Sequence, residues 1–254
     1  MNVSEGQRTA LVATIGQAAG AALLDTHVDP HHHRSVLTLV GEDAPRAVAR
    51  AAVEHLDLRD HQGVHPRIGV VDVVPFVALG DATPADARAA RDRFAAWVAA
   101  ELGVPAFLYG PERTLPDVRR EAFRALAPDA GPPAPHPTAG AVAVGARPVL
   151  VAWNVYLAEP DLALARKVAA AVRGPHLRAL GLAVGDEVQV SMNLVAPDVV
   201  GPAEAWDLVA AHAPTDRAEL VGLVPQSVLD RTPRPRWPRL DLAADRTIEA
   251  RLPA

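Results

Sequence analysis

Apolar residues in the second half of the chain recur with two different periods. Four apolar runs have the length of strands: 148–157, 177–184, 188–195 and 220–224. Two intervening segments, 161–173 and 202–212, instead place apolar residues three and four positions apart, as on the buried face of a helix. Asp161 and Pro202 are residue types preferred at helix starts. The predicted order is therefore βαββαβ.

The first half of the chain predicts nearly the same order. Ser4 and Gln7 have the spacing of a capping box, which predicts a helix directly after them. Further helices are expected over 45–56 and 84–102, and strands over 22–25, 35–41, 70–79 and 104–109. Both halves thus favour the split βαβ arrangement of two ferredoxin-like subdomains, in the α/β (α+β) fold class. The first βαββαβ set lacks a predicted opening strand.

A proline-rich segment separates the two halves. Residues 127–139 read APDAGPPAPHPTA, and such a run can continue neither a helix nor a central strand. We place the domain boundary there, with an N-terminal subdomain over 1–138 and a C-terminal subdomain over 139–254. Residues 231–237, rich in arginine and proline, are expected to form an extended tail.

Composition excludes several classes of function. The 254 residues carry a formal net charge of −5, which argues against extensive binding to nucleic acid or anionic membranes. Because the chain has no cysteine, it has no disulfide, thiolate metal site or cysteine nucleophile. No GxxxxGK[ST] phosphate-binding motif occurs. Neither a signal peptide nor a transmembrane segment is predicted, so we expect a cytoplasmic protein.

The segment 61–69, HQGVHPRIG, concentrates potential chemistry just before a predicted buried strand. It contains two imidazoles, an arginine and two glycines, and loops at strand ends often carry catalytic groups. The proline after His65 restricts the backbone of that histidine to extended conformations. A hydrogen-bonded surface histidine would fit the same pattern, so the loop alone does not define a catalytic site.

Two further clusters allow more than one interpretation. His27 and the run His31, His32 and His33 lie close to aspartates and could bind a metal ion in a metal-dependent hydrolase, but their spacing matches no metal signature and favours a surface loop. Asn154, Gln189, Ser191 and Asn193 interrupt apolar strands, the last three at period two, which predicts one polar sheet face. That face suits either solvent or a polar ligand.

Taken together, these segments resemble the glutamate formiminotransferase family of folate-dependent enzymes. Residues 2–6 are similar to N-F-S-E-G, and residues 61–76 are similar to H-x-G-E-H-P-R-M-G-x-x-D-V-x-P-F. Further matches are found at 34–41, 104–109, 128–132, 144–147, 152–154, 189–194 and 219–225. The matches run in order through most of the chain, which argues against chance agreement.

The resemblance implies a reaction and its residues. The family transfers a formimino group from N-formimino-L-glutamate to tetrahydrofolate, a co-substrate, in histidine degradation and one-carbon metabolism. It requires no metal, and its members are usually homodimers. The catalytic histidine maps onto His65. The stretch that binds folate maps onto Gly131, Pro132, Pro133, Ala134, Pro135, His136, Pro137, Thr138, Ala139 and Gly140.

Substrate-binding roles are expected for residues around these motifs, namely Arg67, Gly69, Asp72, Asn154 and Asn193. The chain also departs from the family pattern. Val64 replaces a glutamate beside the catalytic histidine, and His27 replaces an acid. Such departures leave open an alternative function, that of a catalytically silent homologue that binds folate or a partner.

Overall fold

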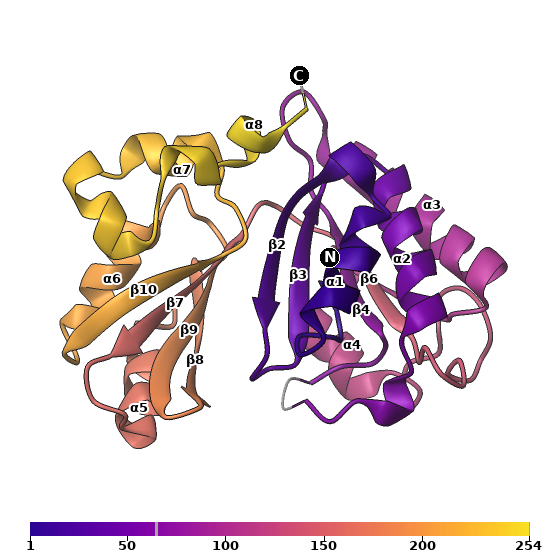
Figure 1. Cartoon of the computed structure of the whole chain (residues 1–254), viewed down its shortest axis with the longest axis horizontal. Helices are drawn as coiled ribbons and strands as arrows, with labels where there is room; N and C mark the ends of the chain where they lie inside the picture. Colours follow the sequence, from indigo (N-terminus) through magenta and orange to yellow (C-terminus); the bar gives the residue numbers. More distant parts are fainter. Residues whose placement is uncertain (64–65, 254) are drawn as a thin grey trace. The chain divides into compact units, whose positions relative to one another are not determined.

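The chain folds into two compact units, Met1–Pro148 and Val149–Leu252 (Figure 1). The structure is a computed structural model and describes residues 1–63 and 66–253. The division falls later than the one predicted at 138/139. The physical reason is that residues 142–146, directly after the proline-rich segment, form a strand that pairs in parallel with two strands of the first unit.

The first unit is built around a six-stranded sheet of order β2-β3-β1-β4-β6-β5. Its strands are β1 (Asn2–Val3), β2 (Leu23–Asp29), β3 (Arg34–Leu39), β4 (Val71–Phe76), β5 (Ala106–Tyr109) and β6 (Val142–Ala146). Its helices are α1 (Thr9–Gln17), α2 (Asp43–His55), α3 (Pro84–Leu102) and α4 (Leu115–Glu121), with short 3-10 helices at Gly20–Ala22 and Leu58–Asp60. Strands β1 to β4 have the order 2-3-1-4 of a ferredoxin-like sheet, which β6 and β5 extend in parallel.

The expectation that this unit lacks its opening strand is wrong. Asn2 and Val3 form β1, which lies between β3 and β4 and is antiparallel to both. The sequence pattern gave no sign of this strand, because two residues are too short to show an alternation of apolar and polar positions. The opening strand therefore holds the central place that a ferredoxin-like sheet requires.

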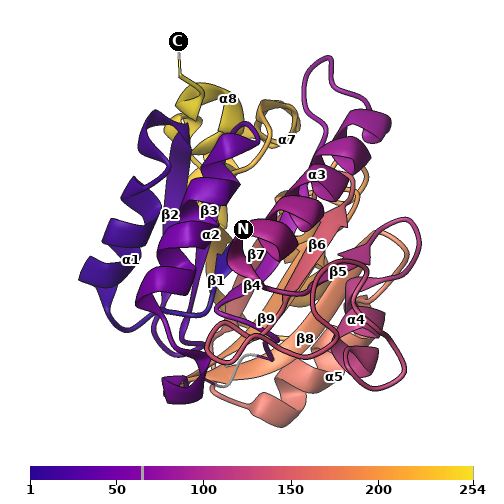
Figure 2. The same ribbon diagram turned by 90° about the vertical axis from the view of Figure 1, so that its right-hand side faces the viewer.

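Helices cover both faces of the first sheet. Helices α1, α2 and α3 lie along one face (Figures 1 and 2), where Ile15, Val48 and Phe94 join a buried cluster with Val142 and Val144 of β6. On the other face, Val118 of α4 packs with Phe107 and Ala143. Because successive strand residues point to opposite faces, the short strand β6 supplies Val142 and Val144 to one core and Ala143 to the other.

The first helix does not begin as predicted. Helix α1 starts at Thr9, and Ser4 does not cap it, because the Ser4 hydroxyl donates to the Gly69 carbonyl at 2.8 Å. The Glu5 carboxylate instead accepts the N–H groups of Gly6, Gln7 and Arg8 at 2.8 to 3.0 Å. The turn before α1 is therefore organised by a buried carboxylate that the local pattern did not indicate.

The second unit confirms the predicted βαββαβ order. It contains β7 (Val151–Leu157), α5 (Leu162–Val172), β8 (Leu177–Val184), β9 (Glu187–Leu194), α6 (Pro202–Ala210) and β10 (Thr215–Val221). The four strands form an antiparallel sheet of order β10-β7-β9-β8, which is the ferredoxin-like order. Trp153, Val190 and Met192 point to one face of the sheet and join a core with Ala165 and Val168 of α5.

The C-terminal segment is helical where an extended tail was expected. It forms α7 (Gln226–Arg231), 3-10 helices at Arg234–Leu240 and Ala244–Arg246, and α8 (Ile248–Arg251). The indole N–H of the buried Trp153 donates to the Leu240 carbonyl at 3.0 Å, so this segment covers the core of the second unit. Proline is compatible with the first turn of a helix, which the composition argument had overlooked. Among the described residues, no helix has the length and apolar character needed to span a membrane.

Candidate active site

The loop before β4 is held by its own arginine and histidine side chains. The Arg67 guanidinium donates to the carbonyls of His61 and Gly63, each at 2.8 Å. The His61 imidazole donates from Nε2 to the His33 carbonyl at 2.8 Å and accepts the Gly63 N–H at Nδ1. Burial lowers the pKa of His61, which keeps the ring neutral for this pair of contacts. His65, predicted as the catalytic residue, and Val64 lie outside the described residues.

The histidine-rich segment forms the hairpin between β2 and β3 and packs on Glu5. His33 donates from Nε2 to the Glu5 carboxylate at 3.1 Å, and its ring lies 4.0 Å from that of His61. His32 pairs through Nδ1 with Asp29. Among the described residues, no three histidine, aspartate or glutamate side chains gather in a group that could hold a metal ion. The histidine-rich hairpin therefore packs beside the loop, with two of its imidazoles bound to carboxylates.

Glu5 predicts a pH-dependent contribution to stability. Burial alone would raise the pKa of Glu5, but the N–H groups of Arg8 and Gln7 and the Arg8 guanidinium outweigh it and lower the pKa to about 2. A lowered pKa stabilises the fold fully above the unfolded value near 4.5, and this stabilisation is lost as the pH falls toward 2. We expect Glu5→Gln to reduce the free energy of unfolding by about 2 kcal/mol at pH 7.

Urea unfolding of wild type and Glu5→Gln at pH 7, 4.5 and 3 measures this contribution. The difference between the two proteins should shrink as the pH falls below 4.5, because Glu5 is then protonated in the unfolded wild-type chain while it stays ionised in the folded one. A difference that stays constant from pH 7 to pH 3 would show that the charge on Glu5 is not what stabilises the turn.

Asp72 lies at an irregularity in β4 that sets the direction of its side chain. Asn2 pairs with Val73 and Val3 pairs with Val71, so Asp72 is the extra residue of a β-bulge against β1. Its carboxylate is buried, with 1% of the residue exposed, and accepts the Ile68 N–H at 2.9 Å. Arg119 of α4 forms an ion pair with it at 2.5 Å. The bulge thus aims a buried carboxylate at the loop.

Three arginine side chains interact with the buried carboxylate of Asp72. Burial lowers the pKa of Arg34, and the positive charge of Arg119 acts in the same direction, whereas Asp29 and Asp72 oppose it. Burial also lowers the pKa of Arg67, which Asp72 opposes. Three guanidinium groups therefore interact electrostatically with the carboxylate of Asp72.

The proline-rich segment pairs with the end of the histidine loop, the segment 61–69 before β4, inside the first unit. The Val70 N–H donates to the Ala139 carbonyl at 3.0 Å, and the Ala141 N–H donates to the Ile68 carbonyl at 2.8 Å. Gly69 and Gly140 face each other in this pairing. His136 closes the preceding turn, since its Nδ1 accepts the Ala139 N–H at 3.0 Å. The predicted folate stretch, 131–140, and the predicted catalytic loop are therefore neighbours, although some 70 positions separate them in the sequence.

The predicted polar residues of the second unit lie on the sheet face opposite its helices. Asn154 pairs with Ser191 and Ala152 pairs with Asn193, which places Asn154 and Asn193 on one face. The Asn154 amide donates to the Glu219 carboxylate at 2.9 Å, and the Tyr156 hydroxyl donates to it at 3.2 Å. Burial and the negative charge of Glu219 raise the pKa of Tyr156 to about 12. On this face Tyr156 stays protonated and donates its hydroxyl hydrogen to Glu219.

Arg119 is a residue of the site that the sequence did not indicate. It lies on α4, a helix that was not predicted. A signal for that helix exists, since Thr114 and Asp117 form a capping box with Pro116 in the first turn. The contact of Arg119 with Asp72 joins positions 47 residues apart, which no local pattern reveals.

Comparisons with known proteins agree with this architecture. A family profile described as the formiminotransferase domain, N-terminal subdomain, matches residues 1–147. A glutamate formimidoyltransferase of Streptococcus pyogenes serotype M1 is 39% identical over 76% of this chain and 75% of the relative. A glutamate formimidoyltransferase of Thermoplasma acidophilum is 34% identical over 90% of this chain and 88% of the relative. A formimidoyltransferase-cyclodeaminase of Sus scrofa is 32% identical over 90% of this chain but over only 50% of its own length.

Fold and comparisons together define an α/β transferase with two ferredoxin-like sheets. The chain belongs to the formiminotransferase family. The profile match ends at residue 147 and the first unit ends at Pro148, so the matched region coincides with the unit that contains the histidine loop.

Proposed function

We propose that this protein is a glutamate formimidoyltransferase that moves the formimino group of N-formimino-L-glutamate to tetrahydrofolate. The observation that carries the proposal is the pairing of residues 68–70 with 139–141, which joins the loop after His65 to the predicted folate stretch. The names of relatives that are 39% and 34% identical over most of the chain support the same reaction. The formiminoglutamate donor belongs to histidine degradation, which is where we place the reaction.

In the proposed mechanism His65 acts as general base and then as general acid. A nitrogen of tetrahydrofolate attacks the formimino carbon and loses its proton to the imidazole, and the imidazole returns a proton to the amine of glutamate as that amine leaves. One carbon–nitrogen bond forms and one breaks, with no net change in protons. A side chain that titrates near neutrality can serve in both steps. Holding the two substrates together supplies much of the remaining rate acceleration.

Charge and hydrogen-bonding groups support the choice of substrates. Formiminoglutamate carries two carboxylates and folates carry a glutamate tail, and the guanidinium of Arg67 is a suitable partner for such a carboxylate. Gly69, with no side chain, permits a close backbone approach there. In the second unit, Asn154 and Asn193 would offer amide groups to polar parts of a substrate. Arg67 and Asp72 also bind the loop backbone, so we assign both of them a role in shaping the site.

The experiment that tests the function is glutamate release from N-formimino-L-glutamate, with and without tetrahydrofolate. We expect release that requires the folate, together with a formimino-folate product detected by mass spectrometry. Folate binding by calorimetry without any release would instead indicate a catalytically silent homologue. The family resemblance further supports a cytoplasmic location and a homodimer, and light scattering of the purified protein tests the dimer.

A further inference from the structure

Arg119 makes the contacts of a residue that holds the histidine loop in place. Its guanidinium donates to the Pro66 carbonyl at 2.6 Å and to both oxygens of Asp72, at 3.2 and 2.5 Å. Asp72 in turn accepts the Ile68 N–H at 2.9 Å. The ion pair therefore binds the loop backbone at two points, one of which is the residue that directly follows His65.

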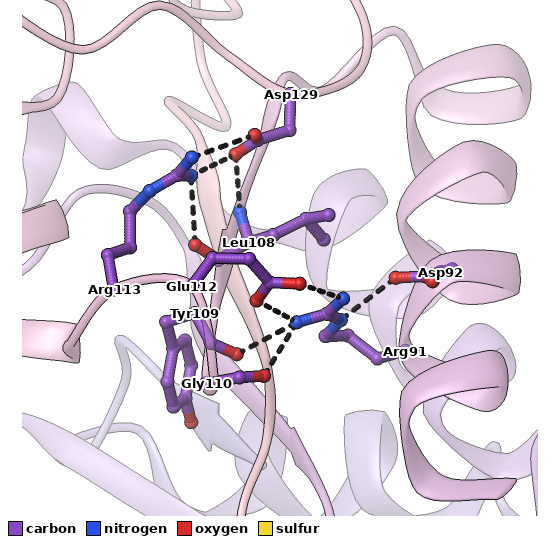
Figure 3. Close-up of polar contacts among 8 residues, drawn as sticks. All are labelled: Arg91, Asp92, Leu108, Tyr109, Gly110, Glu112, Arg113 and Asp129. Atoms are coloured by element: carbon purple, nitrogen blue, oxygen red, sulfur yellow. Dashed lines mark hydrogen bonds and ion pairs between the residues drawn. The ribbon is translucent and has the colours of Figure 1, made fainter. Parts of the chain in front are cut away.

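The position of Arg119 is itself fixed by the fold. Helix α4 has Val118 fully buried against the first sheet, next in sequence to Arg119. The turn that leads into α4 is held by the side chains of Arg91 and Arg113 (Figure 3). From α3, Arg91 donates to the Gly110 carbonyl at 2.6 Å and to the Glu112 carboxylate. From the turn, Arg113 forms an ion pair with Asp129 at 2.5 Å.

Burial of Asp72 favours an intact ion pair with Arg119. Asp72 is only 1% exposed, and an unpaired carboxylate at such a position would be costly. Arginine suits this place because its planar fork can bind a carboxylate with two N–H groups and still reach a carbonyl, which a lysine ammonium does less well. Its neighbour Arg120 is more exposed and pairs with Asp117 and Glu121 on its own helix.

We infer that Arg119 is a positioning residue of the transferase: paired with Asp72, it holds the Pro66 carbonyl and so fixes the backbone directly after His65. This inference rests on the proposed function. The imidazole of a general base must meet the reacting nitrogen within hydrogen-bond distance, and a misplacement of about 1 Å can lower the rate on the order of a hundredfold. Arg119 therefore acts on catalysis through the loop, without touching substrate.

The first test separates positioning from stability. We expect Arg119→Met to lower kcat about a hundredfold and to lower the melting temperature, because Asp72 then loses its partner. The double variant Asp72→Asn with Arg119→Met removes both charges and should recover most of the melting temperature, while kcat stays low because the Pro66 carbonyl remains unbound. Arg120→Met is the matched control and should keep kcat within about twofold. A double variant with wild-type kcat would overturn the inference.

A second readout does not depend on activity. Hydrogen exchange of the peptide that contains Ile68 should be at least about tenfold faster in Arg119→Met than in wild type and Arg120→Met, since the partner of the Asp72 carboxylate is lost. If wild type shows no formimino transfer, the proposed function fails and the exchange experiment still decides whether Arg119 holds the loop. Equal exchange in Arg119→Met and Arg120→Met would overturn the positioning role in either case.

Discussion

Replacing His65 by alanine should lower folate-dependent glutamate release by roughly a thousandfold, within the 10²–10⁴-fold range of general acid–base catalysis. The reaction needs one group that accepts a proton from the folate nitrogen and returns a proton to glutamate, and an alanine can do neither. The described neighbours of position 65 are bound by Arg67 on one side and by Arg119 on the other. We therefore expect the loop backbone and the melting temperature of the variant to remain close to those of wild type.

Two other histidines are useful controls for this experiment. His55 is exposed in the last turn of α2, and His55→Ala should change turnover by less than about twofold. His61 lies in the same loop but donates to the His33 carbonyl and accepts the Gly63 N–H. Turnover that survives in His65→Ala but disappears in His61→Ala, with folding intact in both, would move the general base to His61.

The parts of the fold that the sequence predicts are those in which each element is long enough to show its period. The second unit is the best example, since β7, β8, β9 and the helices α5 and α6 occur where the pattern placed them. Its strands β7, β8 and β9 are seven or eight residues long and rich in apolar residues, and Asp161 caps α5 through its side chain. Periodicity and capping are local properties, so a single sequence reveals them.

The errors occur where a distant contact overrides the local pattern. Asn2 and Val3 become a strand only because β3 and β4 lie on either side of them. Ser4 matches a capping motif, yet its hydroxyl binds the Gly69 carbonyl, 65 positions away. The proline-rich segment looks like a linker, but its last residues pair with residues 68–70 and belong to the first unit. None of these partners can be read from the segment itself.

The residues of the candidate site likewise fall into those that a local motif indicates and those that only distant contacts bring in. His65, Arg67 and Asp72 belong to one short motif, so the sequence could nominate them together. Arg119 of α4 binds the Pro66 carbonyl within that motif, and Glu5 binds His33, whose ring lies beside that of His61; only the folded sheet brings them there. Motifs thus indicate which residues could carry chemistry, whereas the residues that hold them in position come from elsewhere in the chain.

Gly69→Ala should be among the most damaging single substitutions in the first unit. A Cβ at this position would lie 2.0 Å from the Ala141 carbonyl oxygen and 2.7 Å from that of Ala139. Both oxygens belong to backbone that is hydrogen-bonded to residues 68 and 70, so neither can move without breaking the pairing of residues 68–70 with 139–141. We expect the free energy of unfolding, measured in urea, to fall by at least about 3 kcal/mol.

Gly174→Ala is the matched control, because a Cβ there meets no atom within 4 Å. Neither glycine has a positive φ that would strain an alanine, so the two variants differ in steric contact and should differ strongly in stability. Because the pairing at Gly69 also joins the histidine loop to the folate stretch, kcat/KM of Gly69→Ala should fall even in conditions that keep the protein folded. An alanine at position 69 that leaves both the urea midpoint and kcat/KM unchanged would refute the close approach of these two segments, and with it the observation on which the proposed function depends.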